Sequence, residues 1–120
     1  MSDPRVLIVD DDELVGWALE RALSSRHFSV EVVHTLADAR ASFRRAAPEI
    51  VVLDIHLPDG DGLDLLEELH RHSPGTRVMV LSSDATADRR RQADERGAWR
   101  FVEKPFEVGQ VTDLLATCVG

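Results

Sequence analysis

Acidic, hydroxyl and ammonium side chains stand where four apolar segments of this chain end. They are Asp10, Asp11 and Asp12 after residues 6–9, Asp54 after 50–53, Ser82 after 78–81, and Lys104 after 101–102. If the fold gathers them, the carboxylates repel, because two charges about 4 Å apart interact by roughly 4 kcal/mol at an effective dielectric of 20. Compensation must come from Lys104 or from a bound cation.

All-oxygen ligands with no cysteine nearby favour a hard ion, Mg²⁺ or Mn²⁺, over zinc. A carboxylate, such a metal, a lysine and a hydroxyl together describe an aspartyl-phosphate site. Asp54 is the expected nucleophile because it stands alone after its strand. The metal and Lys104 would neutralise the phosphoryl oxygens, and Ser82 would donate a hydrogen bond to one of them.

Lysine is unusually scarce in this sequence. Of fourteen basic residues thirteen are arginine, and Lys104 is the remaining one. An arginine-biased genome would explain this scarcity. A site that needs a compact ammonium, which a planar guanidinium replaces poorly, would explain it equally well. The acidic neighbours expected around Lys104 favour the second explanation.

Simpler explanations exist for several of these residues. Helix capping accounts for Asp12 but not for Asp10 and Asp11 at a buried strand end. The segment 59–62, Asp-Gly-Asp-Gly, resembles part of a calcium loop but lacks the later glutamate, so a turn is expected there. Acidic neighbours surround the arginines at 89–91, which favours a solvated helix face over a nucleic-acid patch.

Apolar periodicity predicts five strands alternating with five helices. The expected strands are 5–9, 28–32, 50–53, 78–81 and 99–102. The expected helices are 13–24, 36–47, 63 to just before Pro74, 86–96 and 108–118. The first, third and fourth strands are apolar throughout, whereas the second and fifth alternate, as edge strands do.

These strands predict an α/β fold, a doubly wound five-stranded parallel sheet of order 2-1-3-4-5 in a flavodoxin-like (βα)5 sandwich. Such sheets bind their ligands beyond the carboxyl ends of the strands, at the switch point between the first and third strands. All the polar residues introduced above lie at those ends.

With the motifs VLIVDDD at 6–12, VVLDIHLPDGDGLDLL at 51–66, the Ser82 pair after VMVL, and FVEKPF at 101–106, the chain resembles the receiver domain of bacterial two-component response regulators. The resemblance extends over residues 1–120, read as a single receiver domain. It implies a phosphoacceptor switch with self-assisted phosphotransfer and autodephosphorylation, not an enzyme.

The resemblance also assigns roles to residues. Asp54 would accept the phosphoryl group from a sensor histidine kinase or phosphotransfer protein. The metal would be held by Asp11, by Asp10 often through water, by Asp54 and by the main-chain carbonyl of His56. Ser82 and Lys104 would contact the phosphoryl group, and the peptide bond before Pro105 is commonly cis in this family.

Four further expectations concern regulation. Ser82 and Phe101 occupy the switch positions, where phenylalanine can rotate inward but cannot donate a hydrogen bond. The resemblance also implies that His56 and Asp84 occupy positions that tune the lifetime of the phosphate in members of this family. The helix 86–96 has only alanines to bury, so it should be weakly anchored. It would form an output surface with the last strand and last helix.

Composition limits the partners. The net charge of −8 argues against direct nucleic-acid contact, and no apolar run could span a membrane. One cysteine, Cys118, fits a reducing cytoplasm. Expected partners are the kinase, an output domain or downstream protein, and a second copy on phosphorylation. Two alternatives stay open: a phosphohydrolase, although His56 stands where it would need a second carboxylate, and a phosphorylation-independent interaction domain.

Overall fold

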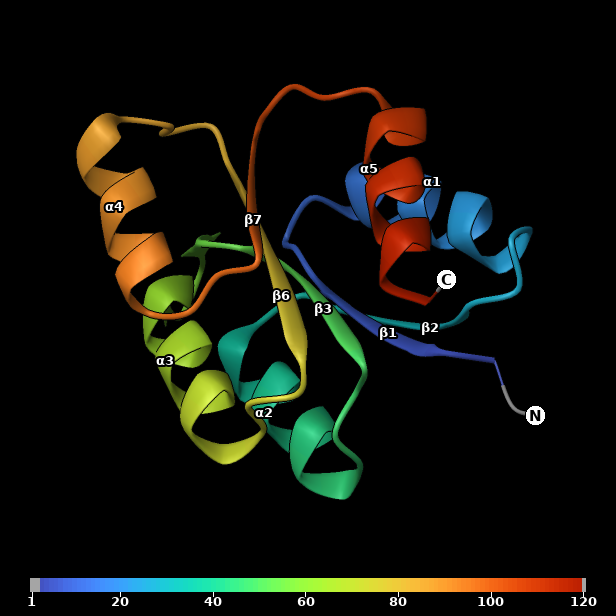
Figure 1. Cartoon of the computed structure of the whole chain (residues 1–120), viewed down its shortest axis with the longest axis horizontal. Helices are drawn as coiled ribbons and strands as arrows, with labels where there is room; N and C mark the ends of the chain where they lie inside the picture. The colour runs from blue at the N-terminus through green and yellow to red at the C-terminus, as the bar shows by residue number, and fades with distance from the viewer. Residues whose placement is uncertain (1–2, 120) are drawn as a thin grey trace.

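The alternation of strands and helices builds one parallel sheet with helices on both faces (Figure 1). The computed structural model describes residues 3–119. Its strands are β1 (Arg5–Val9), β2 (Ser29–Val33), β3 (Ile50–Asp54), β4 (His56–Leu57), β5 (Gly60–Asp61), β6 (Arg77–Ser82) and β7 (Arg100–Glu103). Its helices are α1 (Glu13–Ser24), α2 (Leu36–Arg45), α3 (Gly62–His72), α4 (Ala87–Glu95), α5 (Val108–Ala116) and the short 3₁₀ turn Thr117–Val119.

The sheet has the predicted topology. Its order is β2-β1-β3-β6-β7, which is 2-1-3-4-5 when only the five sheet strands are counted, and every neighbouring pair is parallel. Figure 1 shows α1 and α5 on one face and α2, α3 and α4 on the other. The flavodoxin-like prediction is therefore confirmed, and the carboxyl ends of β1 and β3 lie side by side at the switch point.

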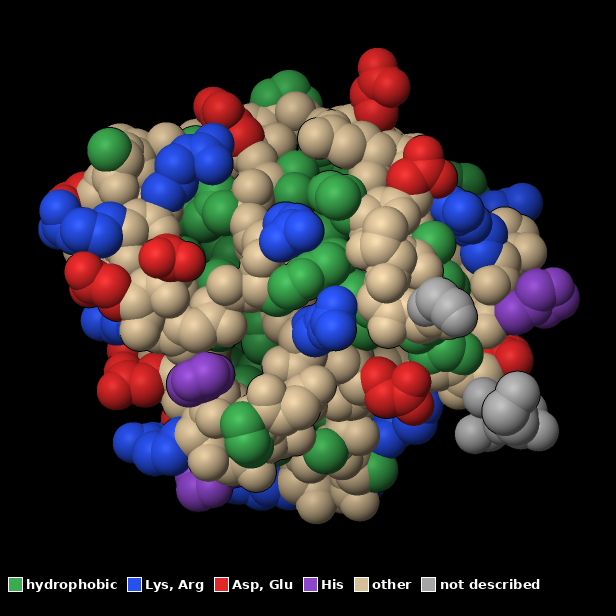
Figure 2. Space-filling model, in the orientation of Figure 1, with side chains coloured by type: hydrophobic (Ala, Val, Ile, Leu, Met, Phe, Trp, Pro, Cys, Tyr) green, Lys and Arg blue, Asp and Glu red, His purple; other side chains and the backbone are tan. Residues whose placement is uncertain are grey.

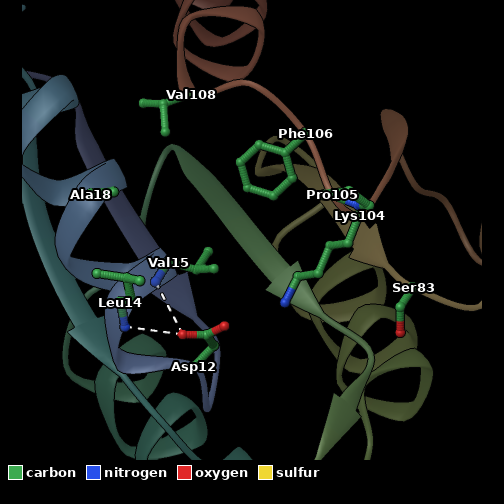
Figure 3. Close-up of a pocket in the computed structure, with 9 residues that line it drawn as sticks. All are labelled: Asp12, Leu14, Val15, Ala18, Ser83, Lys104, Pro105, Phe106 and Val108. Carbon is green, nitrogen blue, oxygen red and sulfur yellow. Dashed lines mark hydrogen bonds between the residues drawn. The ribbon is translucent and has the colours of Figure 1, made fainter.

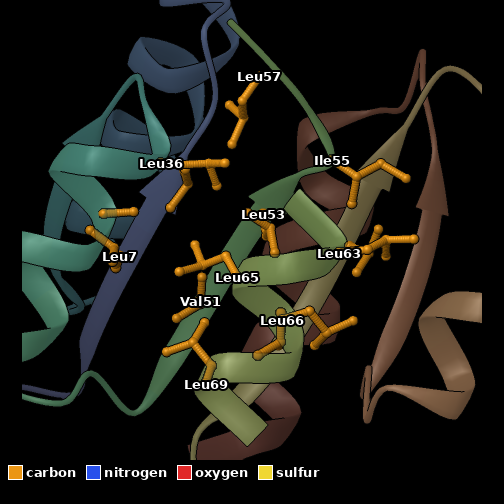
Figure 4. Packing of buried hydrophobic residues seen from close by; sticks show 14 of the residues in the cluster. Leu7, Leu36, Val51, Leu53, Ile55, Leu57, Leu63, Leu65, Leu66 and Leu69 are labelled. Carbon is orange, nitrogen blue, oxygen red and sulfur yellow. The ribbon is translucent and has the colours of Figure 1, made fainter. Parts of the chain in front are cut away.

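Two apolar cores hold the layers together. Alternate side chains of β3 enter opposite cores, Val51 and Leu53 toward α3 and Ile50 and Val52 toward α1 and α5. Figure 4 shows Leu53 among the leucines of α3, all of them almost fully buried. Burying a side chain of this size contributes about 1.5–3 kcal/mol, so β3 is fixed firmly from both sides.

Four helices begin at a side-chain cap that their sequences predispose them to form, and in α2 the cap is Thr35. The Asp12 carboxylate accepts hydrogen bonds from the first turn of α1, as its position before the helix predicted. Asp61 caps α3 and Thr86 caps α4 in the same way. The helix predicted to reach residue 47 ends at Arg45, since the chain before Pro48 is disfavoured from helical geometry.

The segment after β3 forms a small hairpin where only a turn was predicted. β4 and β5 pair antiparallel, with His56 opposite Asp61 and Leu57 opposite Gly60. Gly60 has φ +153°, and a Cβ there would lie 2.7 Å from Leu36, so glycine is required at this corner. Two-residue strands carry too little periodicity to be found in a sequence.

The helix α4 has the least apolar contact. Ala93 is its one buried residue, in agreement with the prediction of weak apolar anchoring. Trp17 on α1 is 55% exposed. Among the described residues, no helix is long and apolar enough to cross a bilayer.

Candidate functional site

Three carboxylates meet where β1 and β3 end. Val9 pairs with Leu53 across the ladder, so Asp10 and Asp54 emerge side by side. Asp10 is fully buried, Asp54 is 5% exposed and Asp11 is exposed. One oxygen from each of the three carboxylates lies within 4.8 Å of the others. The predicted clustering is therefore present, with Asp11 on its solvent side.

Lys104, the residue after β7, reaches this cluster. Its Nζ donates to Asp10 Oδ2 at 2.8 Å and to Asp54 Oδ2 at 3.2 Å. The Lys104 N–H donates to the Ser82 carbonyl at 2.9 Å, which holds the Lys104 backbone beside β6. The peptide bond before Pro105 is cis, as the family resemblance led us to expect. Burial lowers the pKa of Lys104, but the hydrogen bond to Asp10 and the charges of Asp10 and Asp54 outweigh it and raise that pKa.

Asp10 is held rigidly. Its Oδ1 accepts from the Asp12 N–H at 2.9 Å, and its carbonyl accepts from His34 Nδ1 at 2.8 Å. Burial raises the pKa of Asp10 and the Asp54 charge adds to this, while hydrogen bonds from Lys104 and the Asp12 N–H oppose it. His34 is half-buried against the site. It follows β2 as Asp10 follows β1, and this position at a strand end is the feature of the sequence that indicates it.

Asp54 is oriented by the backbone that follows it. Its Oδ1 accepts from the His56 N–H at 2.9 Å, while Oδ2 faces Lys104. The hairpin is fixed in turn, because Asp59 accepts from Leu36 N at 2.8 Å and from Ala37 N at the start of α2. Asp59 and Asp61 therefore connect helices to the loop that positions Asp54, and their predicted structural role fits this arrangement.

Ser82 is buried beside the site but its hydroxyl is engaged elsewhere. Ser82 Oγ accepts from the Asp84 N–H at 2.9 Å and donates to the Asp84 carbonyl at 3.1 Å. Phe101 is half-buried on β7, and the guanidinium of Arg90 lies 4.7 Å from its ring centroid. Neither Ser82 nor Phe101 contacts the carboxylates through a hydrogen bond in this arrangement.

Arg89 also lies close to the site, which the sequence did not suggest. Its Nη2 donates to Asp61 Oδ1 at 3.1 Å, and its Nη1 donates to Gln92 at 2.9 Å. Burial raises the pKa of Asp61. The hydrogen bonds from the Leu63 N–H and from Arg89 together outweigh this effect, so the pKa of Asp61 lies below its usual value. Asp11, His56 and Arg89 line one shallow cleft. The arginines at 89–91 are thus only partly the solvated face that was predicted.

An apolar groove adjoins the site on its other side. Its volume is about 370 Å³, and it is lined by Asp12, Leu14, Val15, Ala18, Ser83, Lys104, Pro105, Phe106 and Val108. Figure 3 shows Lys104 extending across it while Phe106 and Val108 face α1. The face of the molecule in Figure 2 carries apolar side chains in its hollows with both signs of charge around them.

The donor set suits a hard divalent cation. Three carboxylates and one ammonium leave two negative charges uncompensated in a largely buried cluster. Carboxylate oxygens are the ligands that Mg²⁺ and similar ions take, and no sulfur or imidazole joins them in the part of the chain described. The residues present therefore fit a metal of this kind.

An open α/β sheet with an acidic, lysine-containing pocket at its switch point defines a class of phosphoacceptor domains. The family model described as the response regulator receiver domain matches residues 6–116, and the chain belongs to this family. A receiver domain is a phosphoacceptor switch of two-component signalling rather than a classical enzyme.

Relatives support this membership. The chain is 32% identical over 114 residues to the photosynthetic apparatus regulatory protein RegA of Rhodobacter capsulatus, covering 95% of this chain and 62% of RegA. The receiver domain of HemR from Leptospira biflexa is 34% identical with a TM-score of 0.92, covering 98% and 95% of the two chains. The beryllofluoride-activated NtrC4 receiver domain, described as a dimer, is 30% identical with a TM-score of 0.89, covering 95% and 94%.

The chain spans less than two thirds of the length of RegA. The shared part is the receiver domain. Membership implies a histidine kinase as the partner of such a domain.

Proposed function

We propose that Asp54 accepts a phosphoryl group from a sensor histidine kinase or phosphotransfer protein in a reaction that depends on Mg²⁺ or Mn²⁺. The observation that carries this proposal is the environment of Asp54. The His56 N–H fixes one oxygen, Lys104 contacts the other, and Asp10 and Asp11 lie beside it. A carboxylate oriented in this way, among groups that neutralise phosphoryl oxygens, is suited to nucleophilic attack on phosphorus.

The phosphoryl transfer needs no reactant besides the phosphorylated donor and Asp54. An Asp54 oxygen forms a bond to phosphorus while the bond from phosphorus to the donor imidazole nitrogen breaks, and that nitrogen keeps the electron pair and takes a proton. Lys104 balances charge on the phosphoryl oxygens. The metal would be held by Asp10, Asp11, Asp54 and the His56 carbonyl, and it would neutralise further charge there. Water attack on phosphorus later reverses the modification.

Phosphorylation would then switch the surface formed by α4, β7 and α5. Ser82 Oγ leaves Asp84 to donate to a phosphoryl oxygen, and Phe101 turns inward as the loop moves. His56 and Asp84 border the phosphoryl group and set its lifetime. The switched surface controls a downstream protein or an output domain of a longer regulator, or pairs two copies, as the dimeric form of NtrC4 illustrates for that protein. We place this signalling in the cytoplasm.

Acetyl phosphate with Mg²⁺ tests the acceptor directly. The chain should gain the mass of one phosphoryl group, recovered on the peptide that contains Asp54, and chelation of the metal should prevent the gain. Asp54→Asn should abolish it, whereas Asp113→Asn, which changes an exposed carboxylate on α5 that pairs with Arg26, should leave it intact. Equal labelling of Asp54→Asn and the unchanged protein would overturn the proposal.

A further inference from the structure

The hydroxyl of Ser82 is committed to contacts that oppose its proposed role. Both of its hydrogen bonds are to the main chain of Asp84, at 2.9 and 3.1 Å. To reach a phosphoryl group on Asp54, Ser82 Oγ must give up both bonds. Asp84 lies in the segment 83–86, which leads directly into α4 at Ala87. Movement of Ser82 therefore disturbs the position of the first turn of α4.

An ion pair holds that first turn in place. Arg89 is the third residue of α4, and its guanidinium donates to Asp61 Oδ1 at 3.1 Å. The Arg89 side chain is 20% exposed and a second bond to Gln92 fixes its orientation. Asp61 belongs to the hairpin after Asp54 and lies opposite His56 in its ladder. The pair thus joins α4 to the loop that orients the phosphoacceptor.

Little else anchors this end of the helix. Ala93 is the one buried residue of α4 and lies in its second half. Arg90 contacts Phe101, the Ala85 carbonyl and, at 3.7 Å, Glu103 of β7, but both members of that ion pair are exposed. In a helix with so little apolar contact, a partly buried ion pair is a large share of the local stabilisation.

We propose that the Arg89–Asp61 ion pair is an autoinhibitory tether that holds the first turn of α4 against the displacement Ser82 must make on phosphorylation. This inference rests on the proposed function and adds a regulatory contact to it. A contact that favours the ligand-free arrangement reduces affinity for any ligand that requires the other arrangement. Breaking the pair should therefore make the switch easier to activate.

The test is a titration with beryllofluoride, a phosphoryl mimic, at saturating Mg²⁺. Arg89→Gln and Asp61→Asn should each reach half-saturation at about two- to fivefold lower beryllofluoride than the unchanged protein, the range that a partly exposed ion pair supports. Asparagine is a good N-cap, so Asp61→Asn keeps the cap of α3. The double variant should bind beryllofluoride no more tightly than either single variant, because both substitutions remove the same contact.

Two controls separate a tether from other effects. Arg91→Gln removes the same charge from the same helix, but Arg91 pairs with Asp88 and Glu95 within α4, so its titration should match the unchanged protein. If the substitutions acted only through their charge, the half-saturating beryllofluoride concentration would rise in Arg89→Gln and fall in Asp61→Asn. One variant loses a positive charge and the other a negative charge near an anionic ligand. The tether requires both to shift the same way.

Amide exchange of residues 87–95 in the ligand-free protein gives a second readout. It should be faster in Arg89→Gln and Asp61→Asn than in Arg91→Gln. Opposite shifts in the titration, or unchanged exchange in α4, overturn the tether while the unchanged protein still binds beryllofluoride. Failure of the unchanged protein to bind it overturns the proposed function and the tether together.

Discussion

At the scale of single residues, the site is an arrangement that costs stability. Asp10 is fully buried, and its raised pKa means that its ionised form is less favourable in the folded chain than in the unfolded one. Lys104 offsets part of this cost through its 2.8 Å hydrogen bond. A buried carboxylate whose charge destabilises the fold is expected at a site that binds a cation.

Asp10→Asn should therefore stabilise the fold by about 1 kcal/mol near neutral pH, because it removes a buried charge while Lys104 keeps Asp54 as a partner. The sign of the pH dependence follows from the raised pKa. The folded protein takes up the Asp10 proton before the unfolded chain does, so acidification removes the penalty. The advantage of the variant should shrink as the pH falls from about 7 toward the unfolded pKa of about 3.9.

Urea unfolding at several pH values measures this difference. Asp113→Asn is the matched control, since Asp113 is exposed and pairs with Arg26 on the surface, and it should change stability little. An Asp10→Asn protein that is less stable than the unchanged chain at neutral pH would contradict the argument.

At the scale of secondary-structure elements, the sequence predicted the strands and helices that are long enough to show a repeating apolar pattern. The strand order followed from which strands are apolar throughout, and it placed Asp10, Asp54 and Lys104 together because their backbones end at one edge of the sheet. The hairpin β4–β5 and the Arg89–Asp61 pair did not follow from it. They depend on loop geometry and side-chain rotamers, which spacing along a chain does not encode. For the same reason Ser82 could be placed near the site but not oriented.

The junction of β3, the hairpin and α3 is the element contact on which Asp54 depends most. A Cβ on Gly62 would lie 2.7 Å from the Asp54 carbonyl oxygen and 2.7 Å from Ile55 Cα, both main-chain atoms that cannot move independently. Gly62→Ala should destabilise the fold by about 1–3 kcal/mol. It should also weaken beryllofluoride binding, because the same backbone carries Asp54, the proposed phosphoacceptor.

Thermal unfolding and a beryllofluoride titration check this together. Gly75→Ala is the control, because a Cβ at Gly75 meets nothing within 4 Å. Its binding should equal that of the unchanged protein. If Gly62→Ala bound and unfolded like Gly75→Ala, the close approach of α3 to β3 would not matter for the site.

At the scale of the whole molecule, the chain carries a net charge of −8, and three of its carboxylates cluster at one end of the sheet. A cation that binds the folded pocket must stabilise the entire domain, since the unfolded chain does not bring Asp10, Asp11 and Asp54 together. Added Mg²⁺ should raise the free energy of unfolding, by about 1.4 kcal/mol when its free concentration is tenfold above the dissociation constant. Thermal unfolding at constant ionic strength, with NaCl in place of MgCl₂, separates this from general screening of the net charge.

The variants make that test specific to the site. Asp11 is the most exposed of the three acids, so Asp11→Asn should leave the fold intact and remove most of the Mg²⁺-dependent stabilisation. Asp113→Asn makes the same change in net charge far from the pocket and should keep all of it. A stabilisation that survives in Asp11→Asn, or that NaCl reproduces at equal ionic strength, would mean that Mg²⁺ acts on the charge of the whole molecule and not at the switch point. Loss in Asp11→Asn alone would tie the stability of the domain to the pocket in which Asp54 lies.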